Sequence, residues 1–283
     1  MVVIENLIKK YPDFSLNISL DIPEGRVSGL VGRNGAGKST TIKAMLGLIR
    51  PESGSVRIFG KDAASLSVRD KETIGVALSD SGFSNYLTVK SIRKILKDMY
   101  SSFDEVFFDR LCRDLELPMD KPLKDFSTGM KAKLRVIAAI THKAKLLIMD
   151  EPTSGLDVEA RNEVLDILRD YLAENEDCSI LISSHISSDL ENLCDDIWLI
   201  NDGKLILHEE TDSLLDRYGV LKVSEEEYEK LDQSHILAGR KEKYGWRLFT
   251  GEKQYYTENY PEIVIENGSI DDLILIMAGG VKK

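Results

Sequence analysis

The sequence contains no hydrophobic run long enough to cross a membrane. Apolar stretches such as residues 146–149 (LLIM) and 273–277 (LILIM) fall far below the roughly 18 residues that a transmembrane helix needs. Residues 1–14 also lack the charged start, long apolar centre and cleavage site of a secretory signal peptide. We therefore expect a chain with neither a membrane span nor an export signal.

Cysteine is scarce, and basic residues are outnumbered by acidic ones. The three cysteines, Cys112, Cys178 and Cys194, lie far apart without metal-ligand spacing, which indicates reduced thiols in a cytosolic protein. Lys and Arg number 37 against 48 Asp and Glu, so the formal net charge is −11 and the pI is about 5.0. Non-specific nucleic-acid binding requires a broad basic surface, so we expect no nucleic-acid partner, although a local basic site for an anion is still allowed.

Apolar runs typical of buried strands alternate with helical patterns over roughly the first two hundred residues. Each run is continuous rather than alternating, as in a strand that is covered on both faces of its sheet. The four runs cover residues 26–32, 74–78, 145–150 and 179–183. This alternation predicts an α/β fold built on a largely parallel sheet.

Two further segments predict antiparallel strands. Residues 2–23 indicate a pair of strands around a turn near Pro12 and Asp13. Residues 195–210 predict a β-hairpin with its turn at 201–203 (Asn-Asp-Gly), because these residue types accept the backbone angles of a tight hairpin turn. We therefore expect antiparallel strands beside the parallel sheet.

The pattern changes twice more along the chain. Residues 91–117 show helical periodicity, which predicts a helical insertion between two parts of the sheet. Towards the C-terminus the pattern becomes that of a small α/β appendage. We therefore expect one domain over residues 1–218, with a helical subdomain at about 85–140, and a small α/β C-terminal domain of unknown role over 219–283.

Residues 32–40 (GRNGAGKST) match the phosphate-binding pattern G-x-x-x-x-G-K-[ST], which follows an apolar strand and opens a helical pattern here. The glycines let the backbone curl so that its N–H groups point at phosphate oxygens, and the helix start adds its positive end. Lys38 would reach the β- and γ-phosphates of a nucleotide, and Ser39 would ligate Mg²⁺. The alternative is a glycine-rich turn without a ligand. The other predicted nucleotide-binding positions of this loop are Gly32, Arg33, Asn34, Gly35, Ala36, Gly37 and Thr40.

Residues 145–157 (KLLIMDEPTSGLD) form a second strong element. The apolar strand carries Asp150 to its carboxyl end, where ligands bind in a parallel sheet. Asp150 suits a carboxylate associated with Mg²⁺, and Glu151 could accept a proton from an attacking water. Alone, this pair would indicate a polar strand end. Together with the phosphate-binding loop it indicates a catalytic role.

This ordered set of motifs resembles the nucleotide-binding subunits of ATP-binding cassette (ABC) transporters. The resemblance covers about residues 1–215 and rests on GRNGAGKST, FSTGM, LLIMDEP, SGLD and SSHISSDLENLCDDIWLINDGKL. It implies an α/β fold of the P-loop NTPase class, the ABC-type ATPase. Such a fold has a mixed sheet, an antiparallel β subdomain and a helical subdomain, followed here by the small C-terminal α/β appendage.

The resemblance implies roles for five further residues. Tyr11 corresponds to the aromatic residue that stacks on adenine, although a core aromatic residue of the hairpin is an equal alternative. His185 corresponds to the histidine that contacts the γ-phosphate. Asp157 belongs to the loop that crosses the dimer interface in the family, and it is also a good N-cap for the helix that follows. Ser127 and Gly129 correspond to the signature loop, whose serine and second glycine face phosphate.

Two stretches depart from the family pattern. Residues 126–130 read FSTGM where the family usually has LSGGQ, so the first glycine and the glutamine are missing. Ser79 stands where related chains have Gln or sometimes Glu, a residue that senses Mg²⁺ and the attacking water. Serine is too short for the same reach, and Asp80 or a bridging water is the expected substitute. We expect nucleotide binding to be unaffected, whereas the rate of hydrolysis stays open.

The resemblance implies a Mg²⁺-dependent ATPase subunit that moves a separate transmembrane permease. In the family two such subunits meet head to tail, and each signature loop closes on the ATP of the other. The expected partner is therefore a second ATP-binding subunit, either an identical copy or a close paralogue. The expected location is the cytoplasm, at the inner face of the cell membrane through the permease. Likeness to the subunits of bacterial antibiotic and multidrug exporters favours export over import.

Two other classes of function stay open. A soluble ABC-type ATPase for assembly or regulation would work without a permease. A nucleotide-gated binding module would hydrolyse ATP barely at all, and the serine at position 79 is the reason to consider it. An ATPase assay on the isolated chain separates the second of these classes from an enzyme.

Overall fold

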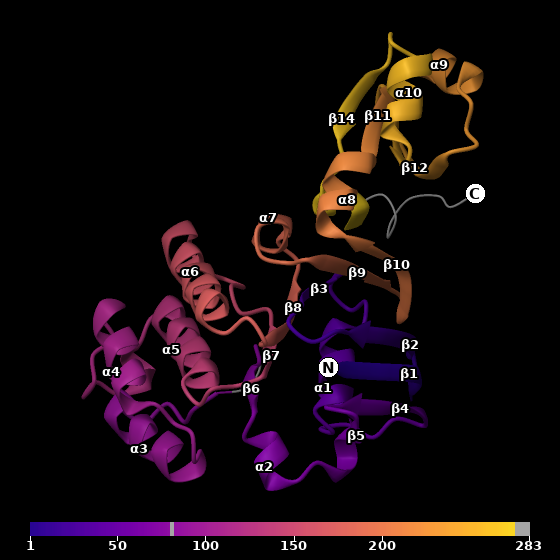
Figure 1. Ribbon diagram of the computed structural model, residues 1–283. Coiled ribbons are helices and arrows are strands. Elements are labelled where there is room, and N and C mark those ends of the chain that lie inside the picture. Colours follow the sequence, from indigo (N-terminus) through magenta and orange to yellow (C-terminus); the bar gives the residue numbers. More distant parts are fainter. Residues whose placement is uncertain (80–81, 275–283) are drawn as a thin grey trace.

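The computed structural model describes residues 1–79 and 82–274. Asp80, which we expected to compensate for Ser79, lies outside the described residues. Within these ranges the strands form three sheets. Figure 1 shows one sheet beside the N-terminus, one through the middle of the molecule and one towards the C-terminal end of the chain.

The central sheet has six strands in the order β10-β9-β3-β8-β7-β6. Neighbouring strands from β9 to β6 are parallel, whereas β10 pairs antiparallel with β9, so the sheet is mixed as predicted. The strands are β3 (Val27–Val31), β6 (Ile74–Ala77), β7 (Leu146–Asp150), β8 (Ser179–Ser184), β9 (Asp196–Asn201) and β10 (Lys204–Glu210). All four predicted runs are strands, and every residue of β3, β7 and β8 is buried, whereas Val76 of β6 is exposed.

The second sheet is antiparallel, as predicted for the start of the chain. Its order is β2-β1-β4-β5. The strands are β1 (Val2–Tyr11), β2 (Phe14–Ile22), β4 (Ser53–Ile58) and β5 (Lys61–Asp62). One apolar cluster joins this sheet to α1 (Lys38–Met45) and to the central sheet, so that α1 lies packed between them.

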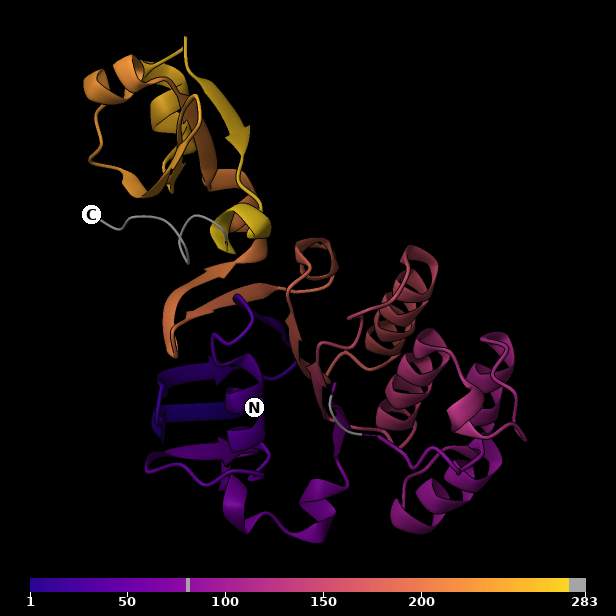
Figure 2. The same cartoon turned by 180° about the vertical axis from the view of Figure 1, so that it is seen from behind.

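Four of the described helices lie on the other side of the central sheet or extend beyond it, namely α3 (Val89–Met99), α4 (Glu105–Asp114), α5 (Thr128–Ile140) and α6 (Val158–Glu174). The short helix α2 (Val68–Lys71) lies between β5 and β6 along the chain. An apolar cluster that includes Ile92, Phe108 and Ile137 joins α3, α4 and α5. Both views place α3 and α4 at the margin of the molecule opposite the antiparallel sheet (Figures 1 and 2), which confirms the helical insertion.

The C-terminal part forms a third, antiparallel sheet in the order β12-β13-β11-β14. Its strands are β11 (Gly219–Val223), β12 (Ile236–Glu242), β13 (Gly245–Thr250) and β14 (Val264–Asn267). The helices of this region are α8 (Thr211–Arg217), α9 (Glu225–Lys230), α10 (Lys253–Asn259) and α11 (Ile270–Asp272), whereas α7 (Ser187–Glu191) lies between β8 and β9 along the chain. Figure 2 shows the sheet beyond the β9–β10 hairpin, joined to it through α8.

An apolar cluster runs across the predicted domain boundary at residue 218. Leu190 of α7 and Leu214 of α8 share this cluster with Phe249 of β13 and Ile270 of α11. The backbone N–H of Ile270 also donates a hydrogen bond of 3.0 Å to Glu191 Oε1. The last described helix therefore packs against α7, and the division at residue 218 stays a prediction.

His142, which follows α5, gives the fold a predicted sensitivity to acid. The side chain is buried, stacks on Tyr100 with 4.0 Å between ring centroids, and burial lowers the pKa of His142 below its ordinary value of 6.5. The unfolded chain therefore binds a proton more readily than the folded one. The contribution of neutral His142 to the free energy of unfolding should be fully present above about pH 6.5 and should fall as the pH drops below it. We expect thermal unfolding to show a smaller loss of stability between about pH 8 and about pH 5.5 in His142→Gln than in the unaltered protein. An equal loss in both proteins would contradict this role.

Candidate nucleotide-binding site

The predicted phosphate-binding loop joins the carboxyl end of β3 to the first turn of α1. Gly35 and Gly37 have φ angles of +82° and +120°, which residues with a Cβ rarely adopt. A Cβ at Gly37 would also lie only 3.0 Å from Leu16 Cδ1 and from Ile200 Cδ1. The local backbone path therefore depends on glycine. It brings the start of α1, where N–H groups have no partner within the helix, to the rim of a cavity.

This cavity has a volume of about 520 Å³. Its walls come from β2, the loop, the start of α1 and the segments that follow β6, β7 and β8. The lining residues are Phe14, Arg33, Asn34, Gly35, Gly37, Lys38, Ser39, Thr40, Ser79, Glu151, Ser154 and His185. Gly32 and Ala36 are buried and lie outside this lining, where the carbonyl of Ala36 accepts a 2.9 Å hydrogen bond from Gly203 N–H. The β9–β10 turn thus supports the loop.

Three of the predicted catalytic and phosphate-binding side chains converge in the cavity. Lys38 Nζ lies 3.2 Å from Glu151 Oε1, and His185 Nδ1 lies 2.5 Å from Glu151 Oε2. Lys38 also donates a hydrogen bond of 2.9 Å to the carbonyl of Gly32. Lys38 is 6% exposed and Glu151 13% exposed, so their charges interact in a partly dehydrated setting. A phosphate group here would meet a cation and a histidine beside a carboxylate, the arrangement that phosphoryl transfer to water needs.

Asp150 ends β7 and is 1% exposed. Its Oδ1 accepts a hydrogen bond of 2.6 Å from Ser183 Oγ, and its Oδ2 accepts one of 3.4 Å from Ser79 Oγ. Hard oxygen ligands of this kind suit Mg²⁺. Among the described residues no group of three or more His, Cys, Asp or Glu side chains could hold a metal ion. Ser39 lines the cavity and Asp150 does not, so ligation of Mg²⁺ by these two residues stays a prediction.

Phe14 was not predicted from the sequence, yet it lines the cavity. It is the register partner of Tyr11 across the turn between β1 and β2, with 6.2 Å between the two ring centroids. Tyr11 is 43% exposed, lies outside the cavity lining and has Lys9 Nζ 5.6 Å from its ring centre. The hairpin pairing could have identified Phe14, because it sets residue 14 opposite residue 11. Stacking of Tyr11 on adenine stays a prediction.

The signature-loop residues and Asp157 lie outside the cavity lining and act as helix starts. Ser127 caps α5, its Oγ accepting a hydrogen bond of 3.1 Å from the N–H of Met130. Gly129 faces α6, where an added Cβ would lie 3.0 Å from Ala160 Cβ. Asp157 caps α6 by accepting a 2.9 Å bond from the N–H of Ala160, as the sequence predicted. Contact of these residues with a second subunit stays a prediction.

A buried carboxylate that the sequence did not reveal joins three segments around the site. Asp189 of α7 is fully buried and accepts a 2.5 Å hydrogen bond from Thr153 Oγ1, two residues after Glu151. Its other oxygen accepts a bond from Arg161 Nε of α6. Because α7 begins at Ser187, two residues after His185, this network fixes the histidine segment against the segment that carries Glu151.

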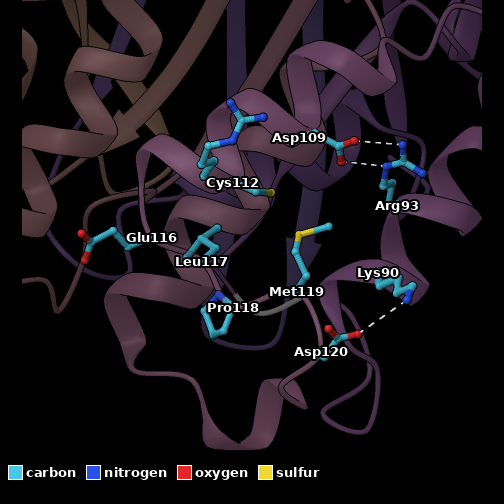
Figure 3. A pocket seen from close by; sticks show the side chains of 10 residues that line it. Lys90, Arg93, Asp109, Cys112, Glu116, Leu117, Pro118, Met119 and Asp120 are labelled. Carbon is cyan, nitrogen blue, oxygen red and sulfur yellow. Dashed lines mark hydrogen bonds and ion pairs between the residues drawn. The ribbon is translucent and has the colours of Figure 1, made fainter.

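A second cavity, of about 610 Å³, lies on the helical insertion between α3 and α4. Figure 3 shows two charged pairs in its lining, and in one of them Arg93 faces Asp109 through two bonds of 2.7 and 2.9 Å. Lys90 faces Asp120 at 3.8 Å. Cys112 is 1% exposed, and burial raises the pKa of its thiol to about 12, so it is not a nucleophile. We therefore assign the chemistry to the smaller cavity, where the charged groups converge.

Comparisons with known proteins agree with this geometry. The sequence profile described as "ABC transporter" matches residues 16–154. The lantibiotic transport ATP-binding protein SrtF of Streptococcus pyogenes is 36% identical over 215 residues, which are 75% of this chain and 92% of that protein. The Nod factor export ATP-binding protein I of Cupriavidus metallidurans is 31% identical over 255 residues, 86% of this chain and 84% of that protein.

Solved structures show the same fold. The ATP-binding subunit of an ABC transporter superposes with a TM-score of 0.67 at 26% identity, covering 76% of this chain and 91% of that one. Within the ranges that the structure describes, no helix has the length and hydrophobicity that crossing a membrane requires. The profile match, the two relatives and the convergence of Lys38, Glu151 and His185 on one cavity show that the chain belongs to the ABC transporter family, among its ATP-binding proteins.

Proposed function

We propose that this protein is the Mg²⁺-dependent ATPase subunit of an exporter and drives a separate membrane permease from the cytoplasmic face of the cell membrane. The observation that carries the proposal is the contact of Glu151 with both Lys38 and His185 in a cavity that the P-loop also lines. The coupling to transport is supported by the name of the lantibiotic transport relative, and the export direction by the name of the Nod factor export relative.

Each side chain of the site has a separate role in hydrolysis under this proposal. The N–H groups at the start of α1 and the ammonium of Lys38 would hold and neutralise phosphate oxygens. Glu151 would orient a water molecule and take its proton as the water oxygen attacks the γ-phosphorus and the bond to the β–γ bridging oxygen breaks. His185 would donate a hydrogen bond to a γ-phosphate oxygen. Mg²⁺, held by Ser39 and Asp150, would supply further charge neutralisation when bound.

We also propose a second ATP-binding subunit that meets the signature loop. Ser127 and Thr128 are exposed at the start of α5, and neither lines the P-loop cavity of the same chain. The start of α5 is thus a second helix N-terminus that is open to an external anion. We propose that it closes on the ATP bound to a second copy of the chain, so that Ser127 completes the partner's site and the partner's Ser127 completes this one.

Co-purification tests the link to a permease. The protein, expressed from its native locus with an affinity tag, should be recovered from detergent-solubilised membranes with a polytopic membrane subunit. Its Mg²⁺-dependent ATPase activity in that complex should rise with the transported compound. ATP hydrolysis by a chain that is recovered only from the soluble fraction would instead support the alternative, a soluble ABC-type ATPase for assembly or regulation. Absence of hydrolysis in both fractions would support the nucleotide-gated binding module.

A further inference from the structure

Helix α5 runs along the edge strand β6 in direct backbone contact. At Gly75, in the middle of β6, an added Cβ would lie 2.1 Å from the carbonyl oxygen of Ala139, so no side chain fits between helix and strand. At the start of the strand, His142 Nε2 lies 3.4 Å from the carbonyl oxygen of Ile74. The two elements are therefore held together at the end of β6 that is remote from the nucleotide cavity and along its middle.

Arg135 extends the contact between α5 and β6 to the residues that follow the carboxyl end of β6. Its Nη1 donates hydrogen bonds of 3.1 Å to the carbonyl of Leu78 and 3.2 Å to the carbonyl of Ser79. The side chain is half-buried, and desolvation lowers the pKa of Arg135 below its ordinary value. Among the described residues it forms no ion pair with a carboxylate. The guanidinium is thus engaged by backbone carbonyls, which fixes the path of the chain that leaves β6.

The segment that Arg135 holds belongs to the nucleotide site. Ser79 lines the nucleotide cavity, and its Oγ donates the 3.4 Å hydrogen bond to Asp150 Oδ2. An adjoining cavity of about 480 Å³ shares three lining residues with it, Ser79, Glu151 and Ser154. On one face of α5, Lys131 and Arg135 line this adjoining cavity. Arg135 therefore links α5, the helix that Ser127 caps, to the edge of the nucleotide site.

We propose that Arg135 is a positioning residue for ATP hydrolysis, which holds the backbone of Leu78 and Ser79 against α5 and thereby keeps Ser79 beside Asp150. This inference rests on the proposed ATPase function. The two hydrogen bonds of Arg135 also join α5, which carries the signature loop at its start, to the edge of the nucleotide cavity. Small displacements of a positioning group lower catalysis strongly, because alignment of water, phosphate and charged groups supplies much of the rate.

Arg135→Ala removes both hydrogen bonds and tests the inference. Turnover of ATP should fall about tenfold, the effect of losing hydrogen bonds from a charged donor, while the KM for ATP changes by less than about threefold because the P-loop is intact. Hydrogen exchange should become faster in the peptide that contains Leu78 and Ser79. Arg135→Lys retains a charged donor that can reach a carbonyl, so it should keep turnover within about threefold of the unaltered chain.

Lys131→Gln is the matched control. It removes a positive charge from the same helix and the same cavity wall, but leaves both bonds of Arg135 in place. Its turnover and hydrogen exchange should match those of the unaltered chain. An equal loss in Lys131→Gln, full activity in Arg135→Ala, or unchanged exchange at Leu78 and Ser79 would each overturn the inference. Lack of hydrolysis by the unaltered chain would instead overturn the proposed function.

Discussion

Glu151→Gln is expected to lower ATP turnover by roughly 10²- to 10⁴-fold while ATP binding is retained, the range for loss of a general base. Glutamine keeps the shape of the side chain, but it cannot accept the proton of the attacking water. The glutamine carries no negative charge, so it would hold Lys38 and His185 less strongly than Glu151 does. Both side chains would then be free to contact phosphate. The nucleotide should therefore bind at least as tightly as in the unaltered chain.

Single-turnover hydrolysis and nucleotide binding, measured on the same preparation, check this expectation. Glu174→Gln is a suitable control, because it makes the same substitution at an exposed position near the end of α6. It should hydrolyse ATP at the rate of the unaltered chain. Turnover by Glu151→Gln within about threefold of the control would remove Glu151 from its catalytic role.

Asp189→Ala is expected to destabilise the fold by about 3 kcal/mol, because it leaves Arg161 and Thr153 without the buried carboxylate that they share. For a chain of this size the loss corresponds to a fall of roughly 6 to 12 °C in the midpoint of thermal unfolding. Asp189 is fully buried, so water cannot replace the lost bonds without disturbing the packing of α7.

Asp166→Ala provides the comparison for that effect. Asp166 is 64% exposed and pairs with Arg169 on the surface of α6, so its loss should cost less than about 1 kcal/mol. Differential scanning calorimetry on both variants and the unaltered chain measures the difference. Midpoints of Asp189→Ala and Asp166→Ala that coincide would show that the buried network does not fix the segment after His185.

Patterns that depend on local sequence predicted much of the fold. Continuous apolar runs identified β3, β7 and β8, because strands covered on both faces have no polar side to alternate with. The same kind of run identified β6, although Val76 of this edge strand is exposed. The Asp202-Gly203 turn fixed the β9–β10 hairpin through its left-handed backbone. The order of the strands in each sheet, and whether neighbouring strands run parallel or antiparallel, depend on contacts between distant segments. The packing of α11 against α7 depends on such contacts as well, and no local pattern encodes them.

The site was predictable where a motif carries its own chemistry. Lys38 and Glu151 were predicted from motifs and His185 from the resemblance to ABC ATP-binding subunits, and the structure brings the three side chains together. Arg135 and Asp189 were missed because their partners lie 28 or more positions away in the chain and include backbone carbonyls. An arginine in the middle of an amphipathic helix ordinarily indicates a solvated face, so its sequence position gave no signal.

The oligomeric state of Glu151→Gln in saturating ATP tests the central claim most directly, namely that each signature loop completes the ATP site of a second copy. Light scattering should give about twice the 31.8 kDa mass of one chain with ATP, and the mass of one chain without it. Adding Ser127→Arg should return the protein to a monomer that still binds ATP, because the bulky cation blocks the start of α5. A Glu151→Gln protein that stays monomeric with ATP bound would contradict the shared site.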